Sequence, residues 1–210
     1  MTKRSAIQLV STVLANSKFI PGLKCVNYPF LNCYSCPLAI GACPVGTVQY
    51  FVITRQLPLL VVGVLGVVGS IWGRMSCAWL CPFGFIQELL YKIPWPGRKL
   101  TIRTRRYAWV KYVVLAALVL GIPYVTLEPW FCKLCPAGTL EAGLPWLAIS
   151  PPLRDLVGLL FWVKIALLVV FVVSAIAISR PFCRFACPLG AAYGLTNRFS
   201  RVRLEVDTDR

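Results

Sequence analysis

The sequence predicts an all-α membrane protein: four transmembrane helices in two pseudo-repeated halves, with short cysteine-bearing helices at the ends of the spans. Composition is the first observation behind this prediction. Of the 210 residues, 58% are hydrophobic and 14% charged, and the mean hydropathy is +0.73, whereas soluble domains are about 25% charged. The other two observations are the gathering of apolar residues into long runs and a cysteine motif that occurs four times.

Four apolar runs are the expected spans, because crossing the hydrocarbon core takes roughly 20 helical residues. The clearest has 18 uncharged residues, and the third and fourth are interrupted only by Lys111 and Lys164. The first run is more polar and could instead lie in the membrane interface. In chain order, the runs are Ser5–Ile20, Gln56–Gly73, Ala108–Leu127 and Leu156–Ser179.

Basic residues predict how these spans are oriented. Residues 1–4, 74–107 and 180–210 hold 15 Lys and Arg, against four in residues 21–55 and 128–155. Because cytoplasmic loops are enriched in Lys and Arg, we expect a multi-pass protein of the cytoplasmic (inner) membrane with both termini in the cytoplasm. The net charge of +15 is therefore assigned to membrane topology and to the lipid bilayer, and no nucleic acid partner is expected.

The repeated motif is C-P-x-G, and every copy has another cysteine three to seven residues upstream. Four copies by chance are very improbable, so we interpret the chain as one membrane-embedded domain of two homologous halves, about 1–107 and 108–210. The motifs begin at Cys43, Cys81, Cys135 and Cys187, and the upstream cysteines are Cys36, Cys77, Cys132 and Cys183.

The motif has a chemical meaning. Proline suits the first turn of a helix, which places each motif cysteine at a helix N-terminus, where the positive end of the dipole favours a thiolate. Since the chain has ten cysteines and no histidine, no haem is expected, and neither is a Ser-His-Asp triad. A cysteine followed by proline is also a ferredoxin pattern, so iron–sulfur ligation is favoured. Structural zinc and a disulfide between Cys25 and Cys33 are the alternatives.

Span geometry predicts which cysteines share a cluster. An 18-residue helix rises about 27 Å, so cysteines at its two ends cannot bind one cluster, and the grouping must cross the halves. The alternative is that broken helices allow each half to hold its own cluster. One predicted set is Cys77, Cys81, Cys183 and Cys187 on the cytoplasmic side; the other, on the outer side, is Cys132 and Cys135 with two of Cys33, Cys36 and Cys43. We favour Cys36 and Cys43 for the outer site, which leaves Cys25 and Cys33 surplus.

Four cysteine-containing stretches, residues 31–46, 73–84, 131–141 and 180–190, carry a resemblance to a known family. Together they resemble the NapH/NosR-type membrane 4Fe-4S binding proteins, the CxxxCP polyferredoxin family. The resemblance implies a four-span electron-transfer subunit with its CxxxCP pairs facing the cytoplasm. Many relatives continue into a soluble ferredoxin domain, whereas no cysteine follows Cys187 here. A separate polypeptide is then expected to supply that function.

The expected function is a membrane electron-transfer subunit with two [4Fe–4S] clusters. It would relay electrons between a quinol or a cytoplasmic ferredoxin-like partner and an extracytoplasmic redox partner. Other redox subunits of a membrane complex are its expected partners, and no catalytic residue is predicted, because the chain would be one subunit of an oxidoreductase complex rather than an enzyme alone. The alternative is an assembly or maturation factor that reduces a metal or a thiol in a periplasmic client.

Overall fold

The computed structural model describes residues 3–17, 24, 26–94, 107, 109–153, 157–197 and 200–201. Within these ranges the elements are all helices, with no strand and one isolated backbone bridge, between Asn27 and Ala42. The all-α class is therefore confirmed for this part of the chain. Cys25 and the basic run at residues 98–106 lie outside the described residues.

The helices follow one another in a similar order in both halves. The first half contains α1 (Lys3–Ala15), α2 (Pro44–Ile53), α3 (Leu59–Ile71), α4 (Met75–Trp79) and α5 (Pro82–Tyr91). The second half opens with α7 (Val110–Val113), which continues without a break through the π-helical stretch Val114–Gly121 into α8 (Ile122–Thr126). Then come α9 (Trp130–Leu134), α10 (Pro136–Gly138), a π-helical turn (Thr139–Gly143), α11 (Leu144–Ile149), a 3-10 turn (Pro151–Leu153), α12 (Leu159–Ala177), α13 (Pro181–Phe185) and α14 (Pro188–Thr196).

Only part of the four-span prediction is reproduced. Among the described residues, α12 alone is long and apolar enough to cross a membrane, judged by length and composition. The predicted first and second spans contain helices of 13 residues each, about 20 Å long, against a hydrocarbon core of about 30 Å. The continuous apolar helix Val110–Thr126 has 17 residues, about 26 Å.

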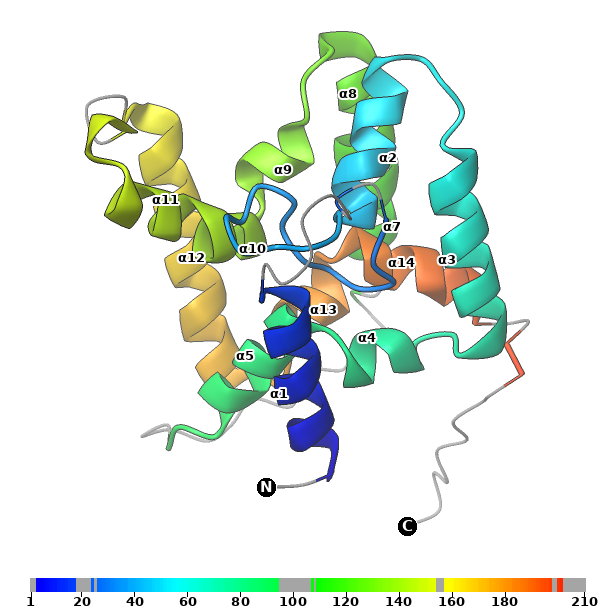
Figure 1. Ribbon diagram of the computed structural model, residues 1–210, viewed down its shortest axis with the longest axis horizontal. Coiled ribbons are helices and arrows are strands. Elements are labelled where there is room, and N and C mark those ends of the chain that lie inside the picture. The colour runs from blue at the N-terminus through cyan, green and yellow to red at the C-terminus, as the bar shows by residue number, and fades with distance from the viewer. Residues whose placement is uncertain are drawn as a thin grey trace.

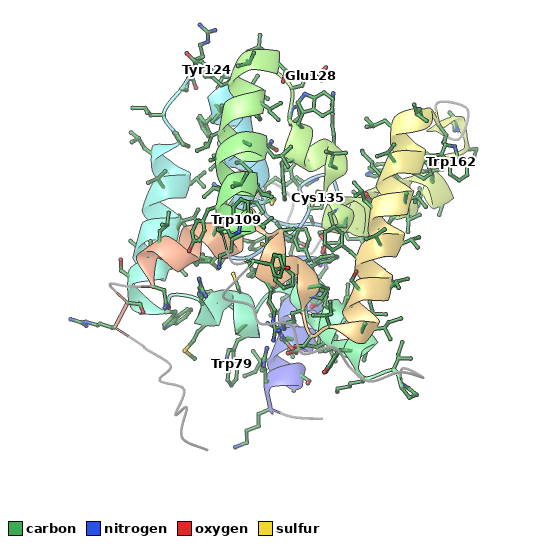
Figure 2. The ribbon with its side chains drawn as sticks, turned by 180° about the vertical axis from the view of Figure 1, so that it is seen from behind. Trp79, Trp109, Tyr124, Glu128, Cys135 and Trp162 are labelled. Carbon is green, nitrogen blue, oxygen red and sulfur yellow. The ribbon has the colours of Figure 1, made fainter. Side chains whose placement is uncertain are left out.

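Helix α12 lies beside short helices that carry motif cysteines (Figure 1). In Figure 1, α12 runs along one side of the molecule, and α2, α3 and α8 stand on the other side. Helix α12 packs against α5 and α13 and also against α9 and α10. Figure 2 shows Cys135 in the interior, with Trp79 towards one end of the molecule and Glu128 towards the other.

Each C-P-x-G motif starts a helix in the same way. Its cysteine is the N-cap in extended conformation, with φ between −75° and −69° and ψ between 114° and 124°, and its proline is the first helical residue. Proline is suited to this place because its missing N–H has no helical partner there. The four N-cap cysteines are Cys43 on α2, Cys81 on α5, Cys135 on α10 and Cys187 on α14. The sequence prediction of four helix N-termini is confirmed.

Candidate iron–sulfur sites

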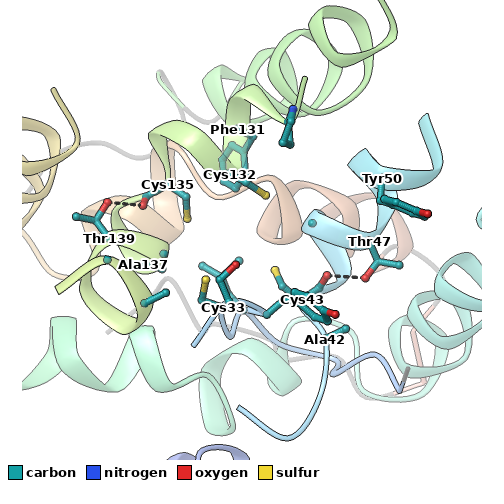
Figure 3. A pocket seen from close by; sticks show the side chains of 18 of the residues that line it. Cys33, Ala42, Cys43, Thr47, Tyr50, Phe131, Cys132, Cys135, Ala137 and Thr139 are labelled. Atoms are coloured by element: carbon teal, nitrogen blue, oxygen red, sulfur yellow. Dashed lines mark hydrogen bonds between the residues drawn. The ribbon is translucent and has the colours of Figure 1, made fainter. Parts of the chain in front are cut away.

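Four cysteines line one cavity of about 1050 Å³. Figure 3 shows their sulfur atoms pointing into a common space. Cys33 comes from the loop that follows α1, Cys43 starts α2, Cys132 lies on α9 and Cys135 starts α10. Two cysteines thus come from each half of the chain. We call these four residues the cavity group.

Electrostatic interactions connect the members of the cavity group. Burial raises the pKa of Cys135 well above its usual value, and the neighbouring Cys43, Cys132 and Cys33 raise it further. Burial also raises the pKa of Cys132 to about 12, with further contributions from Cys43 and Cys33 and an opposing one from Lys164 on α12. Because a thiolate is the form that binds metal, cluster binding at this group would release protons.

The second group consists of the two Cys-x3-Cys-Pro pairs, and we call it the CxxxCP group. Cys77 lies on α4, Cys81 starts α5, Cys183 lies on α13 and Cys187 starts α14. Burial raises the pKa of Cys187, and Cys183, Cys77 and Cys81 each raise it further. The structure therefore brings together the four cysteines that the sequence places on the cytoplasmic side, again two from each half.

The motif glycines face the sulfur atoms. The backbone N–H of Gly84 donates to Cys81 Sγ and that of Gly190 to Cys187 Sγ, each at 3.4 Å. In the cavity group, a Cβ on Gly46 would lie 3.5 Å from Cys132 Sγ, and one on Gly138 would lie 3.5 Å from Cys33 Sγ. The fourth motif residue thus lies beside sulfur atoms, and at Gly84 and Gly190 its backbone N–H donates to one of them.

Cys36 acts electrostatically on Cys33 but is not among the cysteines that line the cavity. It is buried, and its Sγ lies 3.7 Å from Asn16 Oδ1. Cys33 stands in the cavity where the sequence favoured Cys36. The motif count pointed to Cys36 as the upstream partner of Cys43, whereas the backbone turn at residues 33–36 directs Cys33 towards α9 and α10 instead.

Cys33 and Cys81, one member of each group, lie much closer together than the rise of about 27 Å of one 18-residue span. The carbonyl oxygen of Leu31 accepts a weak hydrogen bond from Cys81 Sγ at 3.9 Å. Cys33 follows two residues later, so its backbone lies no more than about 12 Å from Cys81 Sγ. Figure 1 shows α2 and α3 as an antiparallel pair, so the chain turns back between them before it reaches α4.

Cationic side chains surround the CxxxCP group. Burial raises the pKa of Cys183, and the Arg180 guanidinium is the largest opposing cause. Arg74 acts in the same direction on Cys77, and the buried Lys111 interacts electrostatically with Cys187. A negatively charged cluster would be stabilised by these three cations.

Four polar side chains near the cysteines were not singled out by the sequence analysis, although a longer motif would have included them. Each lies six residues after a motif cysteine and makes a hydrogen bond to the opposite half. They are Gln49, Gln87, Glu141 and Tyr193. All four lie at the same distance in sequence from a motif cysteine. Because they are not the same residue type, this regularity is not recognisable as a motif in the sequence alone.

The fold and the two cysteine groups define a helical protein suited to holding iron–sulfur clusters. Residues 54–103, 109–149 and 158–206 match the family described as a 4Fe-4S binding domain. The chain therefore belongs to the 4Fe-4S binding domain family and is of NosR/NapH type. The matched stretches include the whole CxxxCP group together with Cys132 and Cys135.

Several curated proteins are similar over a large part of the chain. It is 34% identical over 139 residues to the regulatory protein NosR of Stutzerimonas stutzeri, covering 61% of this chain and 17% of NosR. It is 28% identical over 210 residues to the methylamine utilization ferredoxin-type protein MauN of Methylorubrum extorquens, covering 95% and 61%. The uncharacterized protein MJ0750 of Methanocaldococcus jannaschii is 28% identical over 161 residues, covering 71% and 60%.

The chain thus spans about 60% of the length of MJ0750 and MauN and a much smaller part of NosR. No solved structure matches the chain.

Proposed function

We propose that the chain is a membrane electron-transfer subunit that holds two [4Fe–4S] clusters. The observation that carries this proposal is the pair of four-cysteine groups, each drawn from both halves. The cavity group, Cys33, Cys43, Cys132 and Cys135, would hold one cluster, with Cys33 in place of Cys36. The CxxxCP group, Cys77, Cys81, Cys183 and Cys187, would hold the other. Each cluster would supply one-electron redox chemistry.

The residues fit a cluster better than a single metal ion. Each group has the four thiols that a [4Fe–4S] cluster needs, and in the CxxxCP group the backbone N–H groups of Gly84 and Gly190 donate to sulfur atoms. In the described part of the chain, no three Cys, Asp or Glu side chains come close enough together to hold one metal ion. A structural zinc draws its four ligands onto one ion, whereas a four-iron cube binds each thiolate at a different iron.

The proximity of the groups supports a relay within the chain. The Leu31 carbonyl at Cys81 and the thiol of Cys33 belong to one short segment, so electrons could pass between the clusters without another protein. We propose that a quinol or a cytoplasmic ferredoxin-like protein exchanges electrons at one side and that an extracytoplasmic redox subunit does so at the other. The ferredoxin-type description of the relative MauN is consistent with this role.

Membrane insertion is part of the proposal. Helix α12 is strongly apolar, yet only 11% of its most apolar 18 residues are buried, so it offers an apolar surface that lipid would cover. Arg4 and Arg180 both pair with Glu88, at 2.8 Å and 3.0 Å. These residues belong to the three segments predicted to be cytoplasmic, which therefore meet at one end of the molecule. We propose a multi-pass protein of the cytoplasmic membrane with both termini in the cytoplasm.

The test is iron and sulfide analysis combined with EPR of cysteine variants. The purified protein should contain about eight iron and eight sulfide per chain. Cys81→Ala and Cys187→Ala should damage the same paramagnetic centre, whereas Cys135→Ala should damage the other. Zinc in stoichiometric amount without visible absorbance would contradict the proposal. Pairing of Cys81 with Cys43, and of Cys187 with Cys135, would show instead that each half holds its own cluster.

A further inference from the structure

Each helix that begins at a C-P-x-G motif carries a buried polar group at the same distance from its cysteine. The sixth residue after Cys43 is Gln49, and its side chain is 0% exposed. The sixth after Cys81 is Gln87, 3% exposed, and the sixth after Cys187 is Tyr193, 1% exposed. Buried polar groups are rarely left without a hydrogen-bond partner, so the partner of each one is informative.

Glu141 is the sixth residue after Cys135. Its carboxyl group is buried even though the residue as a whole is half-exposed, since Oε1 is shielded from solvent. All four motifs therefore place a polar side chain in the interior, in the second turn that follows the motif proline.

In the cavity group these side chains act reciprocally across the halves. Gln49, from the first half, accepts a hydrogen bond at Oε1 from the backbone N–H of Cys132 at 3.3 Å. Its amide nitrogen donates to the carbonyl of Leu118 at 3.0 Å. Glu141, from the second half, accepts at Oε2 from the backbone N–H of Cys33 at 2.7 Å. Each half thus holds the backbone of a cysteine that belongs to the other half.

In the CxxxCP group Gln87 makes two such contacts. Its Oε1 accepts from the backbone N–H of Phe182 at 3.2 Å, and its Nε2 donates to Cys183 Sγ at 3.4 Å. Tyr193 differs, because its hydroxyl donates to the carbonyl of Pro29 at 2.7 Å. Pro29 begins the segment that continues through Leu31, beside Cys81, to Cys33. Gln49, Glu141 and Gln87 therefore each join the two halves of the chain within a single cysteine group. Tyr193 instead ties the CxxxCP group to the segment that leads to the cavity group.

We propose that Gln49, Gln87, Glu141 and Tyr193 are positioning residues that dock the cysteine segments of one half onto the other. They extend the functional motif from C-P-x-G to a seven-residue unit that ends in a cross-half hydrogen bond. The inference rests on the proposed clusters and adds the device that assembles each one. Groups that orient metal ligands through hydrogen bonds are worth about 10–100-fold in metal affinity. Without them, two thiols from one half would no longer be held against two from the other.

The test compares how fast each cluster of the purified, detergent-solubilised full chain is lost to an iron chelator, followed by EPR of each centre. Gln49→Asn and Gln87→Asn keep an amide but shorten it by one methylene group, so the cross-half bond is lost. Glu141→Leu removes its acceptor, whereas Glu141→Gln retains one. Tyr193→Phe deletes a single hydroxyl. Matched controls are Tyr28→Phe, which deletes a hydroxyl bonded within the first half to Ala15, and Glu128→Gln at an exposed acid.

The expected result is selective. Gln49→Asn and Glu141→Leu should accelerate loss of the cavity-group cluster by roughly tenfold or more, and Gln87→Asn should do so for the CxxxCP cluster. Glu141→Gln and both controls should behave as the wild type does. Tyr193→Phe should broaden or shift the EPR signals of both centres, because its bond links the two groups.

Unchanged loss rates in the Asn and Leu variants, or equal acceleration of both centres by every variant, would overturn the inference. If Glu141→Leu fails to accumulate, Gln49→Asn decides the question for the same centre. A wild-type protein without two four-iron centres would overturn the proposed function instead, so the two failures are distinguishable.

Discussion

The cavity group and the CxxxCP group are built from the same motif but differ in their surroundings. The cavity group borders an open space of about 1050 Å³ and has a buried carboxylate, Glu141, bound to the backbone of one of its cysteines. The cavity group also has a cation, Lys164, that opposes its acid. The CxxxCP group lies among three cations, Arg74, Arg180 and Lys111, and one acid, Glu88, which pairs with Arg180. A motif therefore specifies the ligands, whereas the neighbouring charges and the access of solvent set the reduction potential.

The sign of this difference follows from electrostatics. Reduction adds negative charge to a cluster, so nearby cations favour the reduced form and raise the potential, and a nearby carboxylate lowers it. The CxxxCP centre is therefore expected at the higher potential.

The largest expected effect separates Cys33 from Cys36. Cys33→Ala removes a thiol that lines the cavity with Cys43, Cys132 and Cys135, so the cavity centre should be lost or converted to a three-iron form. Cys36→Ala removes a thiol beside Asn16, outside that group, and should leave both centres intact. Iron content and EPR of the two variants measure this. Loss of a centre in Cys36→Ala with retention in Cys33→Ala would restore the ligand set that the sequence favoured.

A smaller effect is expected at Arg180, and it sharpens the comparison of potentials. A unit charge about 10 Å away, at an effective dielectric constant of about 20, contributes roughly 70 mV to a one-electron potential. Arg180→Gln should lower the potential of the CxxxCP centre by an amount of that order and leave the cavity centre almost unchanged. Arg180→Lys keeps the charge and serves as the control. An EPR-monitored redox titration measures both potentials, and an equal shift of the two would refute the charge argument.

The starts of the cysteine-bearing helices were predictable from the sequence. The path that the chain takes between these helices was not. Proline after cysteine fixes a helix start, so four helix N-termini at Cys43, Cys81, Cys135 and Cys187 followed from chemistry alone. The closeness of Cys33 to Cys81 did not follow, because a hydropathy run does not reveal that α2 and α3 form an antiparallel pair (Figure 1). The place of Cys33 likewise depends on a backbone turn between two cysteines that are three residues apart.

The same limit explains the residues that sequence reasoning missed. Gln49, Gln87, Glu141 and Tyr193 share an offset but not a side chain, and their common feature is a hydrogen bond to the other half. Such a pattern becomes visible only when the partners are known. Ligand types can therefore be predicted from one sequence more readily than the groups that orient them.

The smallest expected effect compares two motif glycines. A Cβ at Gly190 would lie 3.2 Å from the carbonyl oxygen of Cys183, whereas one at Gly46 would make its nearest contact with Cys132 Sγ at 3.5 Å. Crowding of the first kind costs about 1–3 kcal/mol and is partly offset by the roughly 1 kcal/mol that alanine gains over glycine within a helix. Gly190→Ala should therefore lower the melting temperature by about 2–4 °C for each net kcal/mol of lost stability. Gly46→Ala makes a contact of ordinary length and gains the same helix propensity, so its melting temperature should be equal to or slightly above that of the wild type. Thermal unfolding of the purified variants, followed by circular dichroism, measures the difference, and a larger loss in Gly46→Ala would show that the cavity group is the more tightly packed of the two.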